Sequence, residues 1–315
     1  MATLPPVYPN QAPRTNSING IPLREDVLFT DAKGNEKPAL RKNAENSLEK
    51  LKAVLPKLLE PGETVLYIAP AVAPLTALEQ LTLGWYALSL KGVTLVLTDR
   101  RLLRFRRKPK GWRDWEWSRG VQAARWSDMA EAKLKGWLVR TLSVKYRSGR
   151  KEQYRINGMG LGKKIKVLIG ALFPQGTAAS GAPTGQDMVS LCPECVKPLT
   201  PRVYQCAGCG LTFKNENTLL WRNFLIPGGG YFYTGWTALG VLQVLPDVSL
   251  IMATITMALV ALHVTSPPAP DPGETAMTAA DAGVAAVIAI GLFLLENFIS
   301  WLHTRNLVRE FLPEH

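Results

Sequence analysis

The spacing of apolar residues changes three times along this chain of 315 residues. Leu48, Leu51 and Leu55 follow a helical period and predict an amphipathic helix that Pro56 kinks or ends. Short runs rich in β-branched and aromatic residues then predict strands, and residues 161–173 return to a helical stripe. Most positions in the last third of the chain are apolar. This order predicts a soluble, strand-rich domain followed by membrane helices.

Polar and turn-forming residues separate these regions. The first forty residues are rich in Pro and Asn with little apolar periodicity, so we expect them to be disordered. They also lack a basic segment followed by an apolar run, which argues against a cleaved signal peptide and predicts a cytosolic first domain. The predicted division is a disordered segment (1–40), a strand-rich domain with an N-terminal helix (41–173), a linker (174–190), a cysteine module (191–214), a membrane domain (217–303) and a cytoplasmic tail (304–315).

The strand-rich domain is expected to form a split β-barrel closed by its last helix, because many antiparallel strands precede one amphipathic helix. The segment GVTLVLTDRRLLRF resembles the signature strand pair of bacterial pleckstrin-homology-like domains, in which an apolar strand ends in Thr-Asp-Arg-Arg and the next begins with paired Leu. The resemblance covers about 60–173, and the insertion WRDWEWSRGVQAARW departs from it and leaves the middle strands undefined. It implies a binding or assembly module, without catalysis, within a multidomain α+β and membrane-α protein.

Positive charge is concentrated in the first part of the chain. Residues 1–190 hold 31 Lys and Arg against 16 Asp and Glu, a net charge of +15, whereas residues 191–315 hold 6 against 9, a net charge of −3. The basic part could meet anionic lipid, nucleic acid or an acidic protein, and charge alone does not choose between them.

Basic and aromatic residues alternate in one stretch of the predicted strands. Three interpretations stay open: a solvated edge hairpin, a surface for anionic lipid or an acidic protein, and a nucleic-acid surface. A membrane tether would hold this surface away from most DNA, which disfavours nucleic acid. The candidate lipid- or partner-binding residues are Arg100, Arg101, Arg104, Arg106, Arg107, Lys108, Lys110, Trp112, Arg113 and Trp115.

The chain's four cysteines form two Cys-x-x-Cys pairs that ten residues separate: Cys192, Cys195, Cys206 and Cys209. This spacing lets four thiolates converge on one Zn²⁺, and a cytosolic location favours metal over disulfides or free thiols. The two pairs resemble the arms of small bacterial zinc ribbons. Gly210 follows the second pair, where such turns often need a positive φ, whereas Val196 takes that place in the first. Four thiolates leave no open position, so the expected zinc is structural.

The last part of the chain resembles small two-helix membrane domains whose core reads as glycines followed by Phe-Tyr-x-Gly, here within PGGGYFYTG. Residues 236–263 would measure about 42 Å as one helix, more than a hydrocarbon core of about 30 Å, and Pro246-Asp247 offers a break. Residues 282–303 fit a single span. We therefore expect two spans, with three as the alternative. The distribution of Arg places both termini in the cytoplasm of a bacterial inner membrane.

Two carboxylates lie within these apolar segments. Asp247 and Glu296 are candidates for a proton or ion role, although a helix break or the membrane interface would also accommodate them. Alanines with four-residue spacing, at 282, 286, 285 and 289, predict a face for helix packing or self-association.

These features favour binding over catalysis. The three histidines lie outside the soluble domain, and the Gly-rich GMGLGKK lacks the spacing of a phosphate loop, so we expect no enzyme. The leading hypothesis is an inner-membrane adaptor that presents its soluble modules to a protein partner and to anionic lipid. The alternatives are an oligomeric transport or membrane-stress component that uses Asp247 or Glu296, and a nucleic-acid-binding protein.

Overall fold

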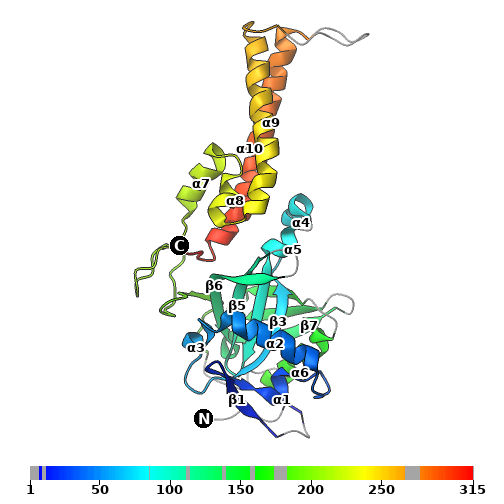
Figure 1. Cartoon of the computed structure of the whole chain (residues 1–315), viewed down its shortest axis with the longest axis vertical. Coiled ribbons are helices and arrows are strands. Elements are labelled where there is room, and N and C mark those ends of the chain that lie inside the picture. Colours follow the sequence, from blue (N-terminus) through cyan, green and yellow to red (C-terminus); the bar gives the residue numbers. More distant parts are fainter. Residues whose placement is uncertain are drawn as a thin grey trace. The chain divides into compact units, whose positions relative to one another are not determined.

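The chain forms two compact units, residues 1–211 and 212–315, which we call the sheet unit and the helical unit. The computed structural model describes residues 7–8, 12–84, 86–110, 114–136, 140–156, 160–173, 183–266 and 277–314. Figure 1 shows the elements of each unit along the chain.

The sheet unit is built on one large, mainly antiparallel sheet. Its strands are β1 (Thr15–Ile18), β2 (Ile21–Arg24), β3 (Val65–Val72), β4 (Gly92–Thr98), β5 (Arg101–Pro109), β6 (Trp115–Arg125), β7 (Met129–Lys135), β8 (Thr141–Tyr146), β9 (Lys151–Ile156) and β10 (Val189–Leu191). The strand order is β10-β6-β5-β4-β3-β9-β8-β7, and the β1–β2 hairpin joins through β2, which runs parallel to β3. The mixed α+β character that the sequence predicted is confirmed.

The sheet divides at β3. This strand pairs with β4 from Val65 to Val72, but with β9 only at its last two residues, Ala71 and Val72. The strands on the two sides of β3 therefore separate along most of its length. The insertion that the sequence left undefined supplies β6, and a short 3-10 helix, η1 (Trp126–Asp128), joins β6 to β7.

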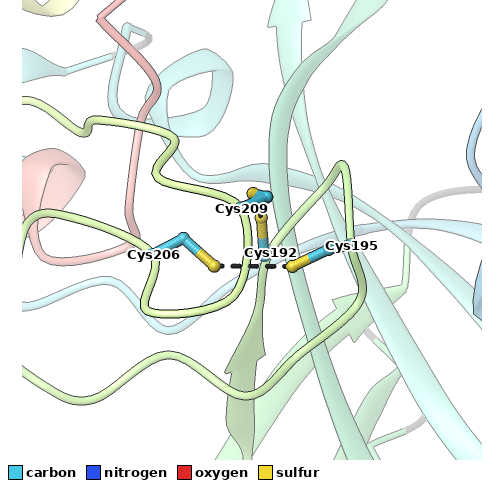
Figure 2. A group of neighbouring side chains, drawn as sticks. All are labelled: Cys192, Cys195, Cys206 and Cys209. Atoms are coloured by element: carbon cyan, nitrogen blue, oxygen red, sulfur yellow. Dashed lines mark hydrogen bonds between the residues drawn. The ribbon is translucent and has the colours of Figure 1, made fainter.

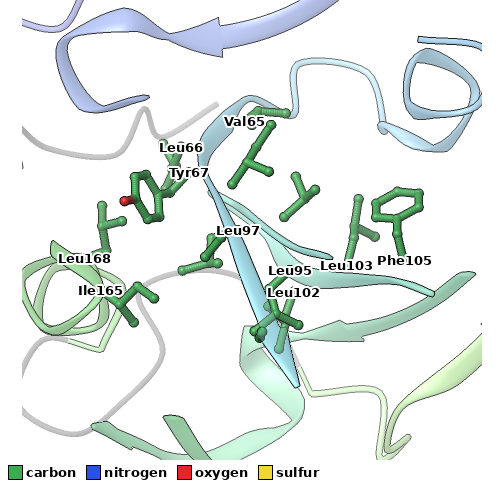
Figure 3. Packing of buried hydrophobic residues seen from close by; sticks show 14 of the residues in the cluster. Val65, Leu66, Tyr67, Leu95, Leu97, Leu102, Leu103, Phe105, Ile165 and Leu168 are labelled. Atoms are coloured by element: carbon green, nitrogen blue, oxygen red, sulfur yellow. The ribbon is translucent and has the colours of Figure 1, made fainter. Parts of the chain in front are cut away.

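A helix and an apolar sheet face make the core of this unit. The helices are α1 (Glu25–Leu28), α2 (Pro38–Leu51), α3 (Leu55–Leu58), α4 (Ala77–Leu83), α5 (Tyr86–Leu90) and α6 (Leu161–Leu172). On α6, Ile165 and Leu168 recur at helical spacing and are fully buried. Figure 3 shows them directed toward Leu97 of β4 and Tyr67 of β3.

The described part of the N-terminal segment is ordered, unlike the disorder that we expected for residues 1–40. It forms β1, β2 and α1, and Ile21, Leu23 and Phe29 are fully buried in the main core. The apolar residues sit in a short hairpin and one helical turn. These elements are too short to give a periodic pattern of apolar residues, and for this reason they were not predicted from the sequence.

A buried lysine ties this segment to α6. Lys164 is 1% exposed, and its ammonium donates hydrogen bonds to the hydroxyl groups of Tyr8 (2.5 Å) and Thr30 (2.7 Å). Burial lowers the pKa of Lys164 to about 7, although the carboxylates of Asp31 and Asp26 act in the opposite direction. The contact joins positions 156 residues apart in the chain.

The helical unit contains α7 (Glu216–Leu225), α8 (Gly229–Thr234), α9 (Thr237–Ala261) and α10 (Ala279–Val308). Two helices, α9 and α10, are long and apolar enough to cross a membrane, and they pack side by side (Figure 1). Ala282, Ala286 and Ala289 are buried along α10, so the small residues serve helix packing within this unit. The helix α9 continues through Pro246, so the predicted break there is wrong.

The start and the end of the helical unit are held together. Phe213 forms a β-bridge with Pro313, and its ring packs edge-to-face against Phe311 with centroids 5.5 Å apart. Glu216 at the first turn of α7 forms ion pairs with Arg305 and Arg309. Residues 304–315, which we expected to be a cytoplasmic tail, therefore pack on residues 212–216.

Candidate functional site

The four predicted metal ligands come together at the end of the sheet unit. Their sulfur atoms all lie within 4.8 Å of one another (Figure 2). The first pair follows β10, which extends the large sheet by pairing with β6 at Val189–Leu191. The cysteine module is therefore anchored to the sheet and shares its compact unit, rather than forming a separate domain.

Each Cys-x-x-Cys pair is closed by the same two backbone hydrogen bonds. In the first, Cys192 N donates to Lys197 O at 2.9 Å and Val196 N donates to Cys192 O at 2.9 Å. The second repeats these bonds from Cys206 to Leu211 O (2.8 Å) and from Gly210 to Cys206 O (2.9 Å). The two turns are thus conformational copies, although their sequences differ.

The residue after each pair adopts a left-handed backbone conformation. Gly210 has φ = 76° and Val196 has φ = 63°. A β-branched residue is unfavourable there, because its Cβ crowds the neighbouring carbonyl. Val196 is only partly buried and packs against the main core. The departure from glycine that the sequence showed does not change the geometry of the turn.

The donor set fits a tetrahedral metal ion. With metal–sulfur bonds of about 2.3 Å, a tetrahedral site places its sulfurs about 3.8 Å apart. The sulfur atoms of Cys192 and Cys209 are 3.6 Å apart, and those of Cys195 and Cys206 are 3.4 Å apart. Four thiolate donors at this spacing are compatible with a metal such as zinc.

Local contacts shift the pKa values of the Cys192 and Cys206 thiols in opposite directions. Burial raises the pKa of Cys192 to about 12. Burial also acts to raise the pKa of Cys206, but backbone N–H groups of Gly208 and Cys209 donate to its sulfur, and with the neighbouring thiols they lower the pKa to about 7. Cys206 is therefore the thiolate most ready to receive a cation.

The Thr-Asp-Arg-Arg segment of the basic stretch forms a buried structural network. The guanidinium of Arg101 donates to both carboxylate oxygens of Glu63, at 3.0 and 2.8 Å, and Glu63 is fully buried. The hydroxyl group of Thr98 donates to the same carboxylate at 2.6 Å, and Thr64 N donates to Asp99 at 2.9 Å. These bonds fasten the β4–β5 turn to the segment that precedes β3.

Other arginines of this stretch also have structural partners. Arg100 donates to Pro61 O at 3.0 Å, and Arg106 donates to Leu90 O at 2.7 Å. Arg104 is buried beside Tyr154. Lys108 forms an ion pair with Glu116 at 3.8 Å. Many of the basic residues that we predicted to bind a ligand therefore form hydrogen bonds or ion pairs within the sheet unit.

The remaining predicted residues lie toward the solvent. Lys110 is exposed, whereas Arg107 and Trp115 are half-buried and stack on each other, with 4.6 Å between the guanidinium carbon and the ring centroid. Trp112 and Arg113 lie outside the described residues.

Asp247 is fully buried in the helical unit, where it holds a tight turn. Its carboxylate accepts a hydrogen bond from Gly228 N at 2.8 Å and another from the side-chain amide of Asn297 at 3.1 Å. Gly228 has φ = 67°, and a Cβ on it would lie 2.3 Å from Gly240 O. The turn can approach α9 this closely only without side chains, which explains the glycines of PGGGYFYTG.

Further polar residues extend this cluster between the helices. Asn223 donates to Asn297 O at 2.7 Å, and the hydroxyl group of Ser300 lies within hydrogen-bond distance of Asn223 (3.1 Å) and Gln243 (2.9 Å). We call the buried residues Asn223, Gln243, Asp247, Asn297 and Ser300 the polar cluster. Glu296, the second predicted carboxylate, lies half-buried at its edge.

Comparison with known proteins yields no family assignment. No family model matches the chain, and no curated protein matches it. The functional argument therefore rests on the geometry of these sites.

The sequence analysis missed most of the polar cluster. Asn297, Ser300 and Thr304 recur on one face of an otherwise apolar helix, and all three are at most 4% exposed. Polar residues at helical spacing in an apolar segment are a signal for an internal polar contact. Their partners on α7 and α9 could not be inferred, because the packing of the helices decides them.

Proposed function

We propose that the protein is an adaptor of the bacterial inner membrane. The sheet unit would act in the cytosol as a pleckstrin-homology-like binding module with a structural zinc ribbon. The helical unit would anchor it, and the exposed part of the basic stretch would meet a protein partner and anionic lipid headgroups. Enzymatic activity is no part of this proposal.

The single observation that carries the proposal is the contrast in surface chemistry between the units. On α9 and α10 large apolar side chains face outward, among them Leu245 (69% exposed), Met252 (56%) and Val287 (69%). Only 11% of the most apolar window of α9 and 22% of that of α10 is buried, unlike the core helix of a soluble protein. Such a surface favours a lipid environment.

The strand order supports the pleckstrin-homology-like assignment. The first long strand, β3, pairs with β4 along its length and with β9 at its end, so the sheet returns to the strand where it began. The helix α6 follows β9 and buries one face in the core. This arrangement supports the proposal of a split barrel closed by its last helix.

The four sulfur atoms support a structural zinc ion. Cys192, Cys195, Cys206 and Cys209 would hold it, and the ion would stabilise the two turns as a cross-link. We expect one zinc ion per purified chain by elemental analysis and its loss in Cys206→Ser. Full zinc retention in that variant would contradict this assignment.

The distribution of charge supports a cytoplasmic location for both ends. Arg222 precedes the first long helix, Arg305 and Arg309 lie in or after the last turns of α10, and the connecting residues 262–278 contain no Lys or Arg. Positive residues favour the cytoplasmic side of a membrane. A hairpin with its connection outside satisfies this rule.

Photo-crosslinking from intact membranes tests the adaptor function. A photoreactive amino acid would replace Lys110, which lies in the basic stretch, or Lys133, an exposed control on β7. We expect a specific protein to be captured from position 110 and not from position 133. Capture of the same proteins from both positions, or of copies of this chain alone, would contradict the adaptor function.

A transport function is the second candidate, and one observation favours it. Among the described residues, the side-chain N–H₂ group of Gln243 and the side-chain oxygen of Asn297 are buried without a hydrogen-bond partner near Asp247. Unpaired polar atoms beside a buried carboxylate could face a passing ion or proton. Asp247→Asn should abolish transport but leave partner capture from Lys110 unchanged.

A further inference from the structure

A polar cavity lies in the sheet unit between α2 and the outer face of the sheet. Its volume is about 330 Å³, and strands β3, β4, β5 and β6 contribute to its walls. The α2 residues Asn43, Asn46, Ser47 and Lys50 share its lining. They are spaced as one helical stripe, beside the separate stripe of Ala44, Leu48 and Leu51 that is buried in the core. This helix therefore presents one face to the core and a polar face to the cavity.

On the wall of the cavity formed by the strands, the guanidinium of Arg107 stacks on the ring of Trp115. Trp115 lies between two cations, the ammonium of Lys50 at 4.8 Å and the guanidinium of Arg107 at 4.6 Å from the ring centroid. Asp114, at the rim, forms an ion pair with Lys50. Two positive charges and one negative charge leave the cavity with an excess of one positive charge.

Arg107 supplies this excess. Among the described residues its guanidinium forms no ion pair and donates no side-chain hydrogen bond; stacking on Trp115 is its recorded side-chain contact. Burial lowers the pKa of Arg107, although the carboxylate of Asp114 acts in the opposite direction. Stacking fixes the plane of a guanidinium and leaves its N–H groups free to donate in that plane. A half-buried cation with free donors is stabilised by an anion.

The other walls indicate which anion fits. The side-chain amides of Asn43 and Asn46 line the cavity and offer donors from a second direction, whereas the hydroxyl group of Ser47 donates to Asn43 O at 2.9 Å. The oxygens of a phosphate group are arranged tetrahedrally and can accept hydrogen bonds from several directions. A carboxylate has two acceptor oxygens, and both lie in one plane. Ile68 and Pro70 line the same cavity and provide apolar contact for the carbon part of a ligand.

We propose that this cavity binds a small phosphate ester, with Arg107 holding the phosphate and Trp115 fixing the guanidinium. The ester is either a soluble metabolite or the headgroup of a phospholipid. The site shares Arg107 and Trp115 with the surface that we assign to partners and lipid, and in that respect it rests on the proposed function. It would make recruitment depend on a ligand.

Calorimetry on the full chain tests this site. The protein is purified in dodecyl maltoside, a detergent without phosphate, and titrated with glycerol 3-phosphate. We expect saturable binding of one ligand per chain, weakened about tenfold or more in Arg107→Gln because a charge-assisted hydrogen bond is lost. Asn46→Glu, at an exposed helical position, should weaken binding similarly by placing a negative charge at the opening.

Lys145→Gln is the matched control, since it removes one positive charge from an exposed position on β8. Its affinity should equal that of the unmodified chain. Absence of saturable binding would overturn the site, and so would an affinity of Arg107→Gln and Asn46→Glu equal to that of the unmodified chain. If binding fails while a specific protein is still captured from position 110 and not from position 133, the cavity proposal falls and the adaptor function stands.

A second arm distinguishes the two sources of the ester. Phosphatidylglycerol is added to the micelles, with oleate as an anionic lipid that lacks phosphate. If phosphatidylglycerol weakens glycerol 3-phosphate binding more than oleate does, the ligand is a lipid headgroup. Equal effects of the two lipids identify a soluble ester.

Discussion

Each unit contains a carboxylate with no exposed surface, Glu63 in the sheet unit and Asp247 in the helical unit, and the two are stabilised in different ways. Glu63 of the sheet unit accepts two hydrogen bonds from the Arg101 guanidinium. Asp247 of the helical unit accepts from neutral donors, the backbone of Gly228 and the amide of Asn297. The first contact is an ion pair inside an apolar core, and the second belongs to a polar interior with an apolar exterior. The comparison indicates that the two units are built for different solvents.

Glu63→Ala should give the largest effect, because it removes the fully buried counterion of Arg101 and leaves only the longer ion pair with Glu60 at 3.6 Å. We expect the sheet unit to lose about 3–5 kcal/mol of unfolding free energy. Hydrogen exchange followed by mass spectrometry would report this as faster exchange in β3, β4 and β5, with α9 and α10 unchanged.

The matched control is Glu60→Ala. Glu60 forms ion pairs with Arg100, Arg125 and, at 3.6 Å, Arg101, but it is partly exposed, so its loss should cost about 1 kcal/mol or less. Equal effects of the two substitutions would show that the buried pair has no special role.

Lys164 makes the stability of the sheet unit depend on pH. Its pKa is about 7 in the folded chain, below the unfolded value of about 10.4. Between these values the unfolded chain binds more protons, so the free energy of unfolding should rise with pH, by about 2–4 kcal/mol. Below about pH 7 both states are protonated and this slope should vanish.

Lys164→Met should remove this pH dependence. Tyr8 and Thr30 keep backbone acceptors in the variant, at Asp31 O and Asp26 O. Denaturant unfolding at pH 7 and pH 10 in both chains isolates the contribution of the lysine. An identical slope in the two chains would show that the lysine is not responsible.

Asp247→Ala should have a smaller effect than Glu63→Ala, because it leaves no uncompensated charge. The N–H group of Gly228 and the amide of Asn297 would each lose an acceptor, at a cost of about 1–3 kcal/mol. Hydrogen exchange in detergent should show loss of protection in α8. Asp247→Asn, which keeps one acceptor oxygen, should lose less, and the reverse order would contradict the assigned bonds.

Gly210→Val gives the smallest effect and compares the two cysteine turns. It places in the second turn the residue type that the first already carries, at φ = 76° with no atom within 4 Å of the added Cβ. The cost should be the left-handed conformation alone, about 1–2 kcal/mol, read as about a tenfold weaker zinc affinity in a chelator competition. Gly210→Asn should lose less, since Asn tolerates this conformation. Equal zinc affinities would show that the conformation carries no cost here.

The sequence predicted local features better than contacts between distant segments. The spacing of the cysteines predicted their convergence, because two short turns and one loop suffice to bring them together. Runs of β-branched and aromatic residues predicted β3 and β4, and a stripe of apolar residues at helical spacing predicted α6. By contrast, the contact between Lys164 and Tyr8 links residues 156 positions apart. No local pattern encodes it.

The basic stretch shows a second limit of sequence reasoning. Its arginines suggested a ligand surface, yet Arg101 and Arg106 turn inward to partners at Glu63 and Leu90. The Glu63 partner precedes β3 and the Leu90 partner ends α5, so charge counting alone could not assign them. The hydrogen-bond partner of Asp247 could not be predicted from the sequence either. Gly228 comes within reach of Asp247 only because α8 packs against α9.

Labelling with a photoreactive phospholipid tests most directly the claim that the helical unit faces lipid with an apolar exterior and a polar interior. After irradiation of native membranes, mass spectrometry locates the labelled residues. The account predicts label on Leu245, Met252 and Val287, and none on Asp247, Asn297 or the strands β3–β5. Label on the polar cluster, or equal label on the sheet and on α9 and α10, would contradict it.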